Sequence, residues 1–271
     1  MSVTTATVRD RFSKEARNWD RLYDGAGATS IYQHNLLRRR KTALEFVGSP
    51  PGRVLDVGCG PGNVTLELPS TCEVTATDFA VPMLQQTRHS AISSRRPIDL
   101  TASDATRLPF ADCTMDTVLT LGLLEYIPEP TEVLREIGRV IRTGGTLVVS
   151  IPNANSPFVM TDDLIKGAKN LVTRILMPAP LRRVIKQLMG KTDTDYFTHK
   201  RHRFDPDAIV SDLNDLGFEI VDRRTHTYGF GVLNRFRINL NLCRKLESMT
   251  GTHPNLERLG WTVVLKAKKR S

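Results

Sequence analysis

One segment constrains this chain more than any other: residues 54–63 read VLDVGCGPGN, an apolar run that leads directly into a glycine-rich turn. Glycines allow a backbone to turn sharply and to approach a ligand with no Cβ in the way. Asp78 ends the next apolar run, 20 residues after Gly58. An acid at that distance from a strand–turn–helix unit can accept hydrogen bonds from both hydroxyls of a ribose. The segment therefore predicts a nucleoside-binding site at the end of a buried strand.

Short apolar runs alternate with helical patterns from residue 53 onward, which is typical of a doubly wound α/β fold with a mostly parallel sheet. Strands are expected at 53–57, 73–77, 99–102, 116–121, 146–151, 218–221 and 261–266. Helices are expected at 19–23, 31–40, 63–68, 81–91, 131–141 and 206–216. The pattern predicts an N-terminal helical flap (1–51), a binding core (52–158), a helical cap or insertion (159–205) and the C-terminal part of the core sheet (206–271).

Charge separates the core from its additions. The 271 residues carry a formal net charge of +9, yet residues 52–158 hold 8 basic and 12 acidic side chains. A nucleic-acid binder usually places a basic stripe on its main fold, so no nucleic-acid partner is expected. The four cysteines are scattered, which argues against a disulfide framework and against a metal site. No apolar stretch reaches the length of a membrane span, and residues 1–20 lack an apolar signal core, which predicts a cytoplasmic protein.

The glycine turn also discriminates between cofactors. Asn63 stands where the third glycine of a dinucleotide-binding G-x-G-x-x-G would fall, which disfavours NAD. Instead, DVGCGPG (56–62) resembles the first motif of class I S-adenosylmethionine-dependent methyltransferases. The resemblance continues through TDFA (77–80), SDA (103–105), DTVLTLGLLEYI (116–127) and RVIRTGG (139–145). It is strong over 52–158, and is closest to the ubiquinone/menaquinone-biosynthesis type and related natural-product, small-molecule enzymes.

That resemblance implies a seven-stranded, mostly parallel sheet with one antiparallel strand. It also implies S-adenosyl-L-methionine as cofactor and methyl transfer to a small-molecule acceptor. Asp78 is expected at the ribose, Phe79 against adenine, Asp104 near the adenine amino group, and Tyr23, with Arg39 a weaker choice, near the cofactor carboxylate. The implied cofactor-binding residues are Tyr23, Asp56, Gly58, Cys59, Gly60, Asp78, Phe79, Met83, Asp104, Ala105 and Leu121.

The catalytic candidates are Glu125, Tyr126 and His202. Glu125 and Tyr126 follow the fourth strand, beside the expected methyl group, where they would position the acceptor or remove its proton; the alternative is a helix start with a capping acid. His202 lies in a basic run (198–204) that suits a base, or a solvated linker. In ubiquinone-type O-methyltransferases this loop reads roughly E-x-L-E-H, whereas Gly122 and Tyr126 replace its first acid and its histidine here. No metal is therefore predicted.

Residues 162–189 combine apolar stripes with lysines and arginines, as in a lid over the substrate or a helix lying on a membrane. Either use suits a lipophilic acceptor, so this segment is a candidate for peripheral membrane contact. Two other functions stay open. A pI of about 9.6 allows a nucleic-acid methyltransferase, and the cofactor site would also serve a non-methylating module such as a cyclase. The acceptor, the choice among O-, C- and N-methylation, and the oligomeric state are left open.

Overall fold

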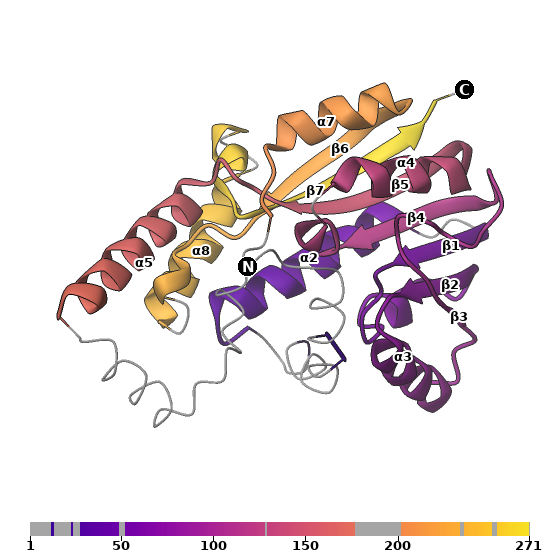
Figure 1. The fold of residues 1–271 in the computed structure, drawn as a ribbon, viewed down its shortest axis with the longest axis horizontal. Helices are drawn as coiled ribbons and strands as arrows, with labels where there is room; N and C mark the ends of the chain where they lie inside the picture. The colour runs from indigo at the N-terminus through magenta and orange to yellow at the C-terminus, as the bar shows by residue number, and fades with distance from the viewer. Residues whose placement is uncertain are drawn as a thin grey trace.

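The fold was analysed in a computed structural model, which describes residues 12–13, 23, 28–48, 52–127, 129–176, 202–233, 236–250 and 254–270. Seven strands form one sheet in the order β3-β2-β1-β4-β5-β7-β6 (Figure 1). Their bounds are β1 Gly52–Val57, β2 Cys72–Asp78, β3 Asp99–Ala102, β4 Met115–Leu121, β5 Ile141–Pro152, β6 Phe218–His226 and β7 Thr262–Lys269. Strands β1 to β5 pair in parallel, and β7 runs antiparallel between β5 and β6. The predicted sheet is confirmed.

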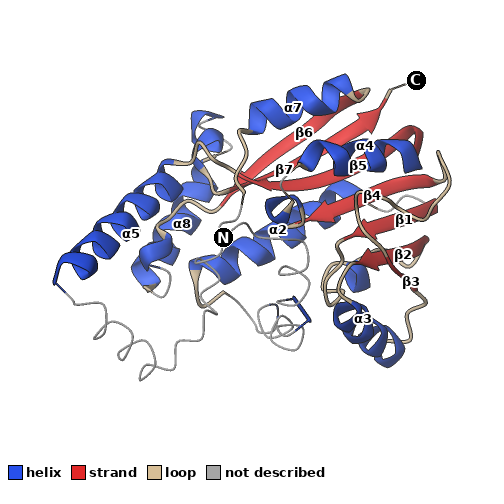
Figure 2. Cartoon of the chain, in the orientation of Figure 1, coloured by secondary structure: helices blue, strands red, loops and turns tan. Residues whose placement is uncertain are grey.

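Helices cover both faces of this sheet (Figure 2). Their bounds are α2 Ile31–Val47, α3 Val81–Ser93, α4 Pro130–Val140, α5 Pro157–Leu176, α7 Pro206–Asp215 and α8 Arg237–Met249. The described residues also form four short 3-10 helices: η1 Thr65–Glu67, η2 Leu124–Tyr126, η3 Gly231–Leu233 and η4 Pro254–Leu259. None of the helices in the described ranges is long and apolar enough to cross a lipid bilayer.

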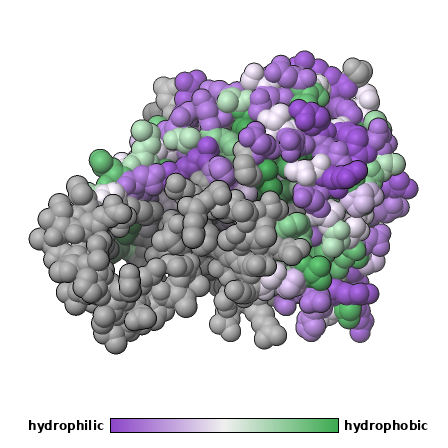
Figure 3. All heavy atoms as spheres, viewed as in Figure 1, coloured by the Kyte–Doolittle hydropathy of each residue, from purple (hydrophilic) through white to green (hydrophobic). Residues whose placement is uncertain are grey.

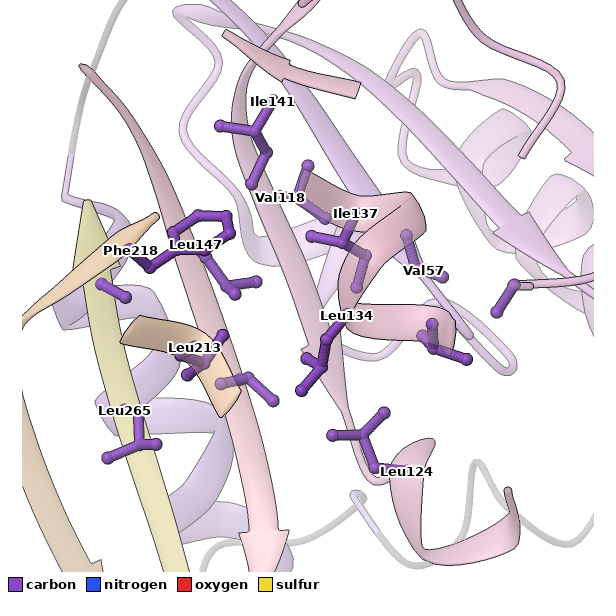
Figure 4. Close-up of a cluster of buried hydrophobic side chains, with 14 of the residues drawn as sticks. Val57, Val118, Leu124, Leu134, Ile137, Ile141, Leu147, Leu213, Phe218 and Leu265 are labelled. Carbon is purple, nitrogen blue, oxygen red and sulfur yellow. The ribbon is translucent and has the colours of Figure 1, made fainter. Parts of the chain in front are cut away.

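Two apolar clusters fix the layers. On one face, Leu134 and Ile137 of α4 and Leu213 of α7 pack against the strands (Figure 4). On the other face, Ala43 and Phe46 of α2 pack in a cluster that includes the strand residues Val54, Leu119, Val148 and Val264. A strand buried on both faces needs a nearly continuous apolar run, which is the pattern that made β1 and β4 recognisable in the sequence.

The helix expected at 63–68 is wrong: only η1 follows the glycine turn. Pro69 disfavours a helical conformation in the residue before it, and Leu68 is accordingly extended, with ψ of 150°. Strand β5 is longer than expected because it continues through Gly144, whose φ of 73° accommodates a register shift against β4. Helix α8 was not predicted at all.

The expected cap is described only in part. Helix α5 begins at Pro157 and continues to Leu176, and residues 202–205 connect to α7. The part of the apolar, basic segment 162–189 that follows residue 176 lies outside the described residues, as does most of the expected helix at 19–23. Asp162 of α5, only 4% exposed, accepts hydrogen bonds from the backbone amides of Gly231 and Val232. This carboxylate ties α5 to η3.

Candidate functional site

A cavity of about 990 Å³ opens where β1, β2 and β4 end. The order of strands reverses between β1 and β4, and ligands of open α/β sheets bind at the carboxyl ends of the strands beside such a reversal. The lining includes every residue predicted above for cofactor binding or catalysis: Tyr23, Asp56, Gly58, Cys59, Gly60, Asp78, Phe79, Met83, Asp104, Ala105, Leu121, Glu125, Tyr126 and His202. The fold therefore brings all of these candidates to one site.

The glycine turn is shaped by backbone conformations that favour glycine. Gly58, Gly60 and Gly62 have φ of 75°, 56° and 85°. A Cβ at residue 62 would lie 2.7 Å from the Cγ2 of Thr87, and one at residue 58 would lie 3.1 Å from a methyl of Leu123. Residues 58 and 62 therefore have no room for a side chain, whereas a Cβ at residue 60 would have no atom within 4 Å and would project into open space.

Asp78 is held by the turn that it faces. Its Oδ2 accepts a hydrogen bond of 2.9 Å from the amide of Gly60, and its Oδ1 accepts one of 2.8 Å from the amide of Ala80. Thr87 of α3 donates from its hydroxyl to the Gly60 carbonyl at 2.9 Å. The carboxylate, the turn and α3 thus form one fixed unit, which presets the position of any ligand hydroxyl that Asp78 binds.

The floor of the cavity is acidic and poorly solvated. Burial raises the pKa of Asp56 to about 6, against the opposing effect of a 2.6 Å hydrogen bond from the Thr65 hydroxyl. Burial also raises the pKa of Asp78, against the opposing effect of its backbone hydrogen bonds. A cation bound beside two such carboxylates favours their charged forms, so this floor suits a positively charged ligand.

The wall beside β3 carries the third predicted acid. Asp104 follows β3, and its Oδ1 accepts hydrogen bonds from the amide and the hydroxyl of Thr106 at 2.9 and 2.8 Å. Met83, in the first turn of α3, is 1% exposed. These residues place an apolar surface and a fixed carboxylate on the same side of the cavity as Asp78, as a bound adenosine would require.

The catalytic candidates meet at the end of β4. The amide of His202 donates to the carbonyl of Glu125 at 2.8 Å, which places the segment before α7 beside η2. Glu125 is 5% exposed. The ring of Tyr126 meets that of Phe12 edge to face, with centroids 4.9 Å apart. Three side chains able to bind or transfer a proton therefore line one part of the cavity.

Helix α2 contributes lining residues that the sequence reasoning missed. Tyr32, Asn35 and Leu36 line the cavity together with Arg39, all from one side of this helix. Asn35 is fixed because its amide donates to the hydroxyls of Thr227 and Thr262 at 2.9 and 2.8 Å. Residues three or four positions apart lie on the same side of a helix, so this spacing was the signal that could have identified them in the sequence.

Gly122 has a φ of 71°, a backbone conformation that favours glycine, and it lies against the guanidinium of Arg39. A Cβ there would lie 2.5 Å from a guanidinium nitrogen of Arg39. Tyr23 and Glu125 raise the pKa of Arg39, against the opposing effect of burial. The place that the first acid of the E-x-L-E-H loop would take is thus next to the guanidinium of Arg39.

Among the described residues, one group offers metal-ligand atoms within 4.8 Å of one another: His34, Cys243 and Glu247. These residues do not line the cavity. Nε2 of His34 and Nε of Arg38 lie 3.0 and 3.2 Å from Oε2 of Glu247. With the guanidinium already beside the carboxylate, the group forms an ion-pair network that joins α2 to α8.

Comparisons with known proteins agree with this geometry. Residues 55–149 match the family described as methyltransferase domain. The chain is 40% identical over 116 residues to a demethylmenaquinone methyltransferase of Renibacterium salmoninarum, covering 42% of this chain and 47% of that protein. It is also 40% identical over 114 residues to a phosphatidylethanolamine N-methyltransferase of Cereibacter sphaeroides, covering 41% and 55%. The matches span about half the length of these relatives.

Solved structures share the whole fold. Magnesium protoporphyrin IX methyltransferase from Synechocystis PCC 6803 superposes with a TM-score of 0.65 at 16% identity, covering 98% of this chain and 100% of that one. The cyclase SpnF superposes with a TM-score of 0.62 at 18% identity, covering 98% and 96%. With the strand order and the glycine turn, these findings confirm the predicted fold and family: the chain carries, at residues 55–149, a class I methyltransferase domain whose cofactor is S-adenosyl-L-methionine.

Proposed function

We propose that this chain transfers the methyl group of S-adenosyl-L-methionine to a small, lipophilic acceptor. The observation that carries the proposal is the fixed unit of Asp78, Gly60 and Thr87 at the floor of the cavity. At Gly60 this unit exposes backbone to open space that a Cβ would fill, next to the Asp78 carboxylate, which can accept hydrogen bonds. The residues present therefore fit a nucleoside with a positive charge.

Each part of the cofactor has residues to hold it. Asp78 would bind the ribose hydroxyls, and Met83 with Phe79 would pack on the adenine. Asp56 would favour the positive charges by Coulomb attraction. Arg39 and Tyr23 would bind the carboxylate, since their side chains lie at the cavity near Gly122. When bound, the cofactor supplies a methyl group on a positively charged sulfur.

The chain's own contribution is alignment, exclusion of water and removal of one proton. Orienting two reactants can supply about 7–11 kcal/mol of a barrier. Glu125, Tyr126 and His202 would hold the acceptor at the end of β4, and one of them would take the proton that the acceptor loses. Their shared position in the cavity supports this assignment.

The acceptor side of the cavity favours a lipophilic molecule. Beyond the predicted cofactor residues, its lining includes the apolar or aromatic side chains of Leu36, Ile127, Val159, Phe12 and Trp261, together with polar residues such as Glu129, Glu132 and Asp163. Two of the similar proteins are named for demethylmenaquinone and phosphatidylethanolamine. Both names support a lipophilic acceptor without choosing between carbon, nitrogen and oxygen.

Calorimetry with Asp78→Ala tests the cofactor site. The variant should bind S-adenosyl-L-methionine at least about tenfold more weakly, because a hydrogen bond to a charged group is worth about 1.5–3 kcal/mol. Asp99→Ala, an exposed acid at the start of β3, is the matched control and should bind as the wild type does. Unchanged affinity in Asp78→Ala, with the fold intact by circular dichroism, would remove the ribose assignment.

A panel of prenylated, phenolic and lipid acceptors with methyl-labelled cofactor tests the reaction. Label in the acceptor together with S-adenosylhomocysteine is the expected result. Conversion of an acceptor without S-adenosylhomocysteine would instead favour the cyclase-type alternative. Label in RNA, with steep salt dependence, would favour a nucleic-acid methyltransferase, which the acidic balance of residues 52–158 disfavours.

A further inference from the structure

Helix α8 has two apolar faces, and only one of them is buried. Leu240 and Cys243 are 5% and 0% exposed and pack in a cluster with Ile31 of α2. Ile238 and Leu242 are 77% and 42% exposed. A soluble helix that covers a core needs one apolar stripe, so this second apolar face is not needed to cover the core formed by the described residues.

The outward stripe is regular. Ile238, Leu242, Lys245 and Met249 follow one another at intervals of four, three and four residues, which places them on one side of the helix. Phe236, directly before α8, is 60% exposed, and Leu233 of η3 is 39% exposed. Large apolar side chains at this density are uncommon on a surface that faces only water.

Helix α5, at the same end of the molecule, carries exposed apolar residues of its own. It contacts η3 through Asp162, and its residues Met160 and Leu164 are 60% and 74% exposed one turn apart. Figure 1 shows α5 and α8 at the end of the molecule opposite α3, and Figure 3 shows apolar atoms at that end. The outward surface, hereafter, is Leu233, Phe236, Ile238, Leu242 and Met249.

Basic residues flank this surface. Arg237, Arg244 and Lys245 of α8 are exposed. The single acid of α8, Glu247, is held by His34 and Arg38 and is 9% exposed in its side chain. The surface is therefore apolar with a positive border. Helix α8 is polar on average, but its outward side carries protruding apolar side chains bordered by arginine and lysine. Apolar side chains can insert among acyl chains while basic side chains contact negatively charged headgroups, so this surface suits an anionic lipid bilayer.

We propose that the outward surface docks this chain on an anionic lipid bilayer, with the apolar side chains among the acyl chains and the arginines at the headgroups. The sequence pointed to residues 162–189 for such contact, whereas α8 and η3 supply most of the surface proposed here.

Flotation of the full chain with lipid vesicles, without cofactor or acceptor, tests the docking separately from methyl transfer. The wild type should float with vesicles of phosphatidylcholine and phosphatidylglycerol, and less with phosphatidylcholine alone. Ile238→Asn should lower the partition coefficient at least about tenfold, because one buried aliphatic side chain is removed from the lipid. Ile92→Asn is the matched control: Ile92 is 71% exposed on α3, away from this surface.

The charges are tested with Arg237→Gln and Arg244→Gln. Each should weaken binding to the phosphatidylglycerol vesicles about fivefold and leave binding to phosphatidylcholine unchanged. Thermal unfolding should be unaltered in all of these variants because every changed side chain is exposed. Equal behaviour of Ile238→Asn and Ile92→Asn, or a wild type that does not float, would overturn the proposal. A wild-type dimer in sedimentation that Ile238→Asn dissociates, without vesicle binding, would instead assign the surface to a second copy of the chain.

Discussion

The backbone amide of His202 lies 2.8 Å from the carbonyl oxygen of Glu125 and donates a hydrogen bond to it. This bond fixes the segment before α7 across the end of β4. It brings a histidine from the C-terminal part of the chain to the part of the cavity that Glu125 and Tyr126 line.

If this cluster removes a proton from the acceptor, His202→Gln should lower kcat roughly 10²-fold, the lower range for general-base catalysis. Tyr126→Phe should do so instead if the phenol is the proton acceptor. Neither variant should change the affinity for S-adenosyl-L-methionine by more than about twofold. Steady-state kinetics and calorimetry measure the two effects. His89→Gln, an exposed histidine on α3, is the control, and wild-type kcat in both variants would exclude proton removal by these two side chains.

Arg39 should contribute to cofactor affinity through the carboxylate. Arg39→Met keeps much of the side-chain length but removes the charge, and should weaken S-adenosyl-L-methionine binding roughly 10-fold or more, as expected for a charge-assisted hydrogen bond. Lys41→Met, on the same helix with its side chain 66% exposed, should bind normally. If Arg39→Met binds the cofactor normally but loses affinity for the acceptor, the guanidinium belongs to the acceptor side.

Gly62 should be the least replaceable glycine of the turn for stability. Gly62→Ala combines a left-handed backbone, costing about 1–2 kcal/mol, with the clash against Thr87, costing about 1–3 kcal/mol. Gly217→Ala separates the two effects, because its φ is 83° but no atom lies within 4 Å of the added Cβ. Urea unfolding should show a larger loss in the free energy of unfolding for Gly62→Ala than for Gly217→Ala; equal losses would mean that Thr87 moves without cost.

Cofactor binding should weaken as the pH falls through about 6. Asp56 has a pKa near 6 in the free protein because it is buried, and only its ionised form attracts a cation. Between pH 7 and pH 5 the ionised fraction falls about tenfold, and the association constant should follow it. Calorimetry in buffers of different ionisation enthalpy should detect proton release near pH 6. Asp56→Asn should flatten the pH dependence, and an unchanged slope in that variant would assign it to another group.

His226 should make the fold sensitive to acid. Burial lowers its pKa to about 4, against the opposing charge of Glu247, and its Nε2 has no hydrogen-bond partner among the described residues. The unfolded chain binds this proton near pH 6.5, so the free energy of unfolding should fall between pH 6.5 and 4, by up to about 1.4 kcal/mol per pH unit.

Urea unfolding at pH 7 and pH 5 measures this effect. Between these two pH values, the free energy of unfolding should fall less in His226→Gln than in the wild type. Asp56 acts in the opposite direction over nearly the same range, because its raised pKa favours the folded state as the pH falls toward 3.8. The comparison must therefore be made between variants at each pH. His89→Gln should keep the wild-type difference, and an identical difference in His226→Gln would contradict the assignment.

Some parts of this protein could be predicted from neighbouring residues alone. The strand before Gly58 was recognisable because a strand buried on both faces requires an apolar run, and the turn because it requires glycines. Asp78 was recognisable because it ends the next apolar run. The prediction of a helix at 63–68 was wrong because Pro69 disfavours a helical conformation in the residue before it, so that only the short η1 forms. Helix α8 was missed because Ile238, Leu240 and Leu242 alternate with polar residues, as in a strand.

Sequence by itself determined the sheet and the glycine turn, since these follow from the chemistry of short segments, and the resemblance of its motifs to a known family identified the cofactor class. Tertiary structure alone decided that His202 lies beside Glu125, that Arg39 lies over Gly122, and that Leu240 faces the core while Ile238 faces outward. These relationships join residues that are distant in the chain or differ only in which neighbours surround them. They depend on how α2, α8 and the segment before α7 pack against the rest of the fold, which local preference does not specify.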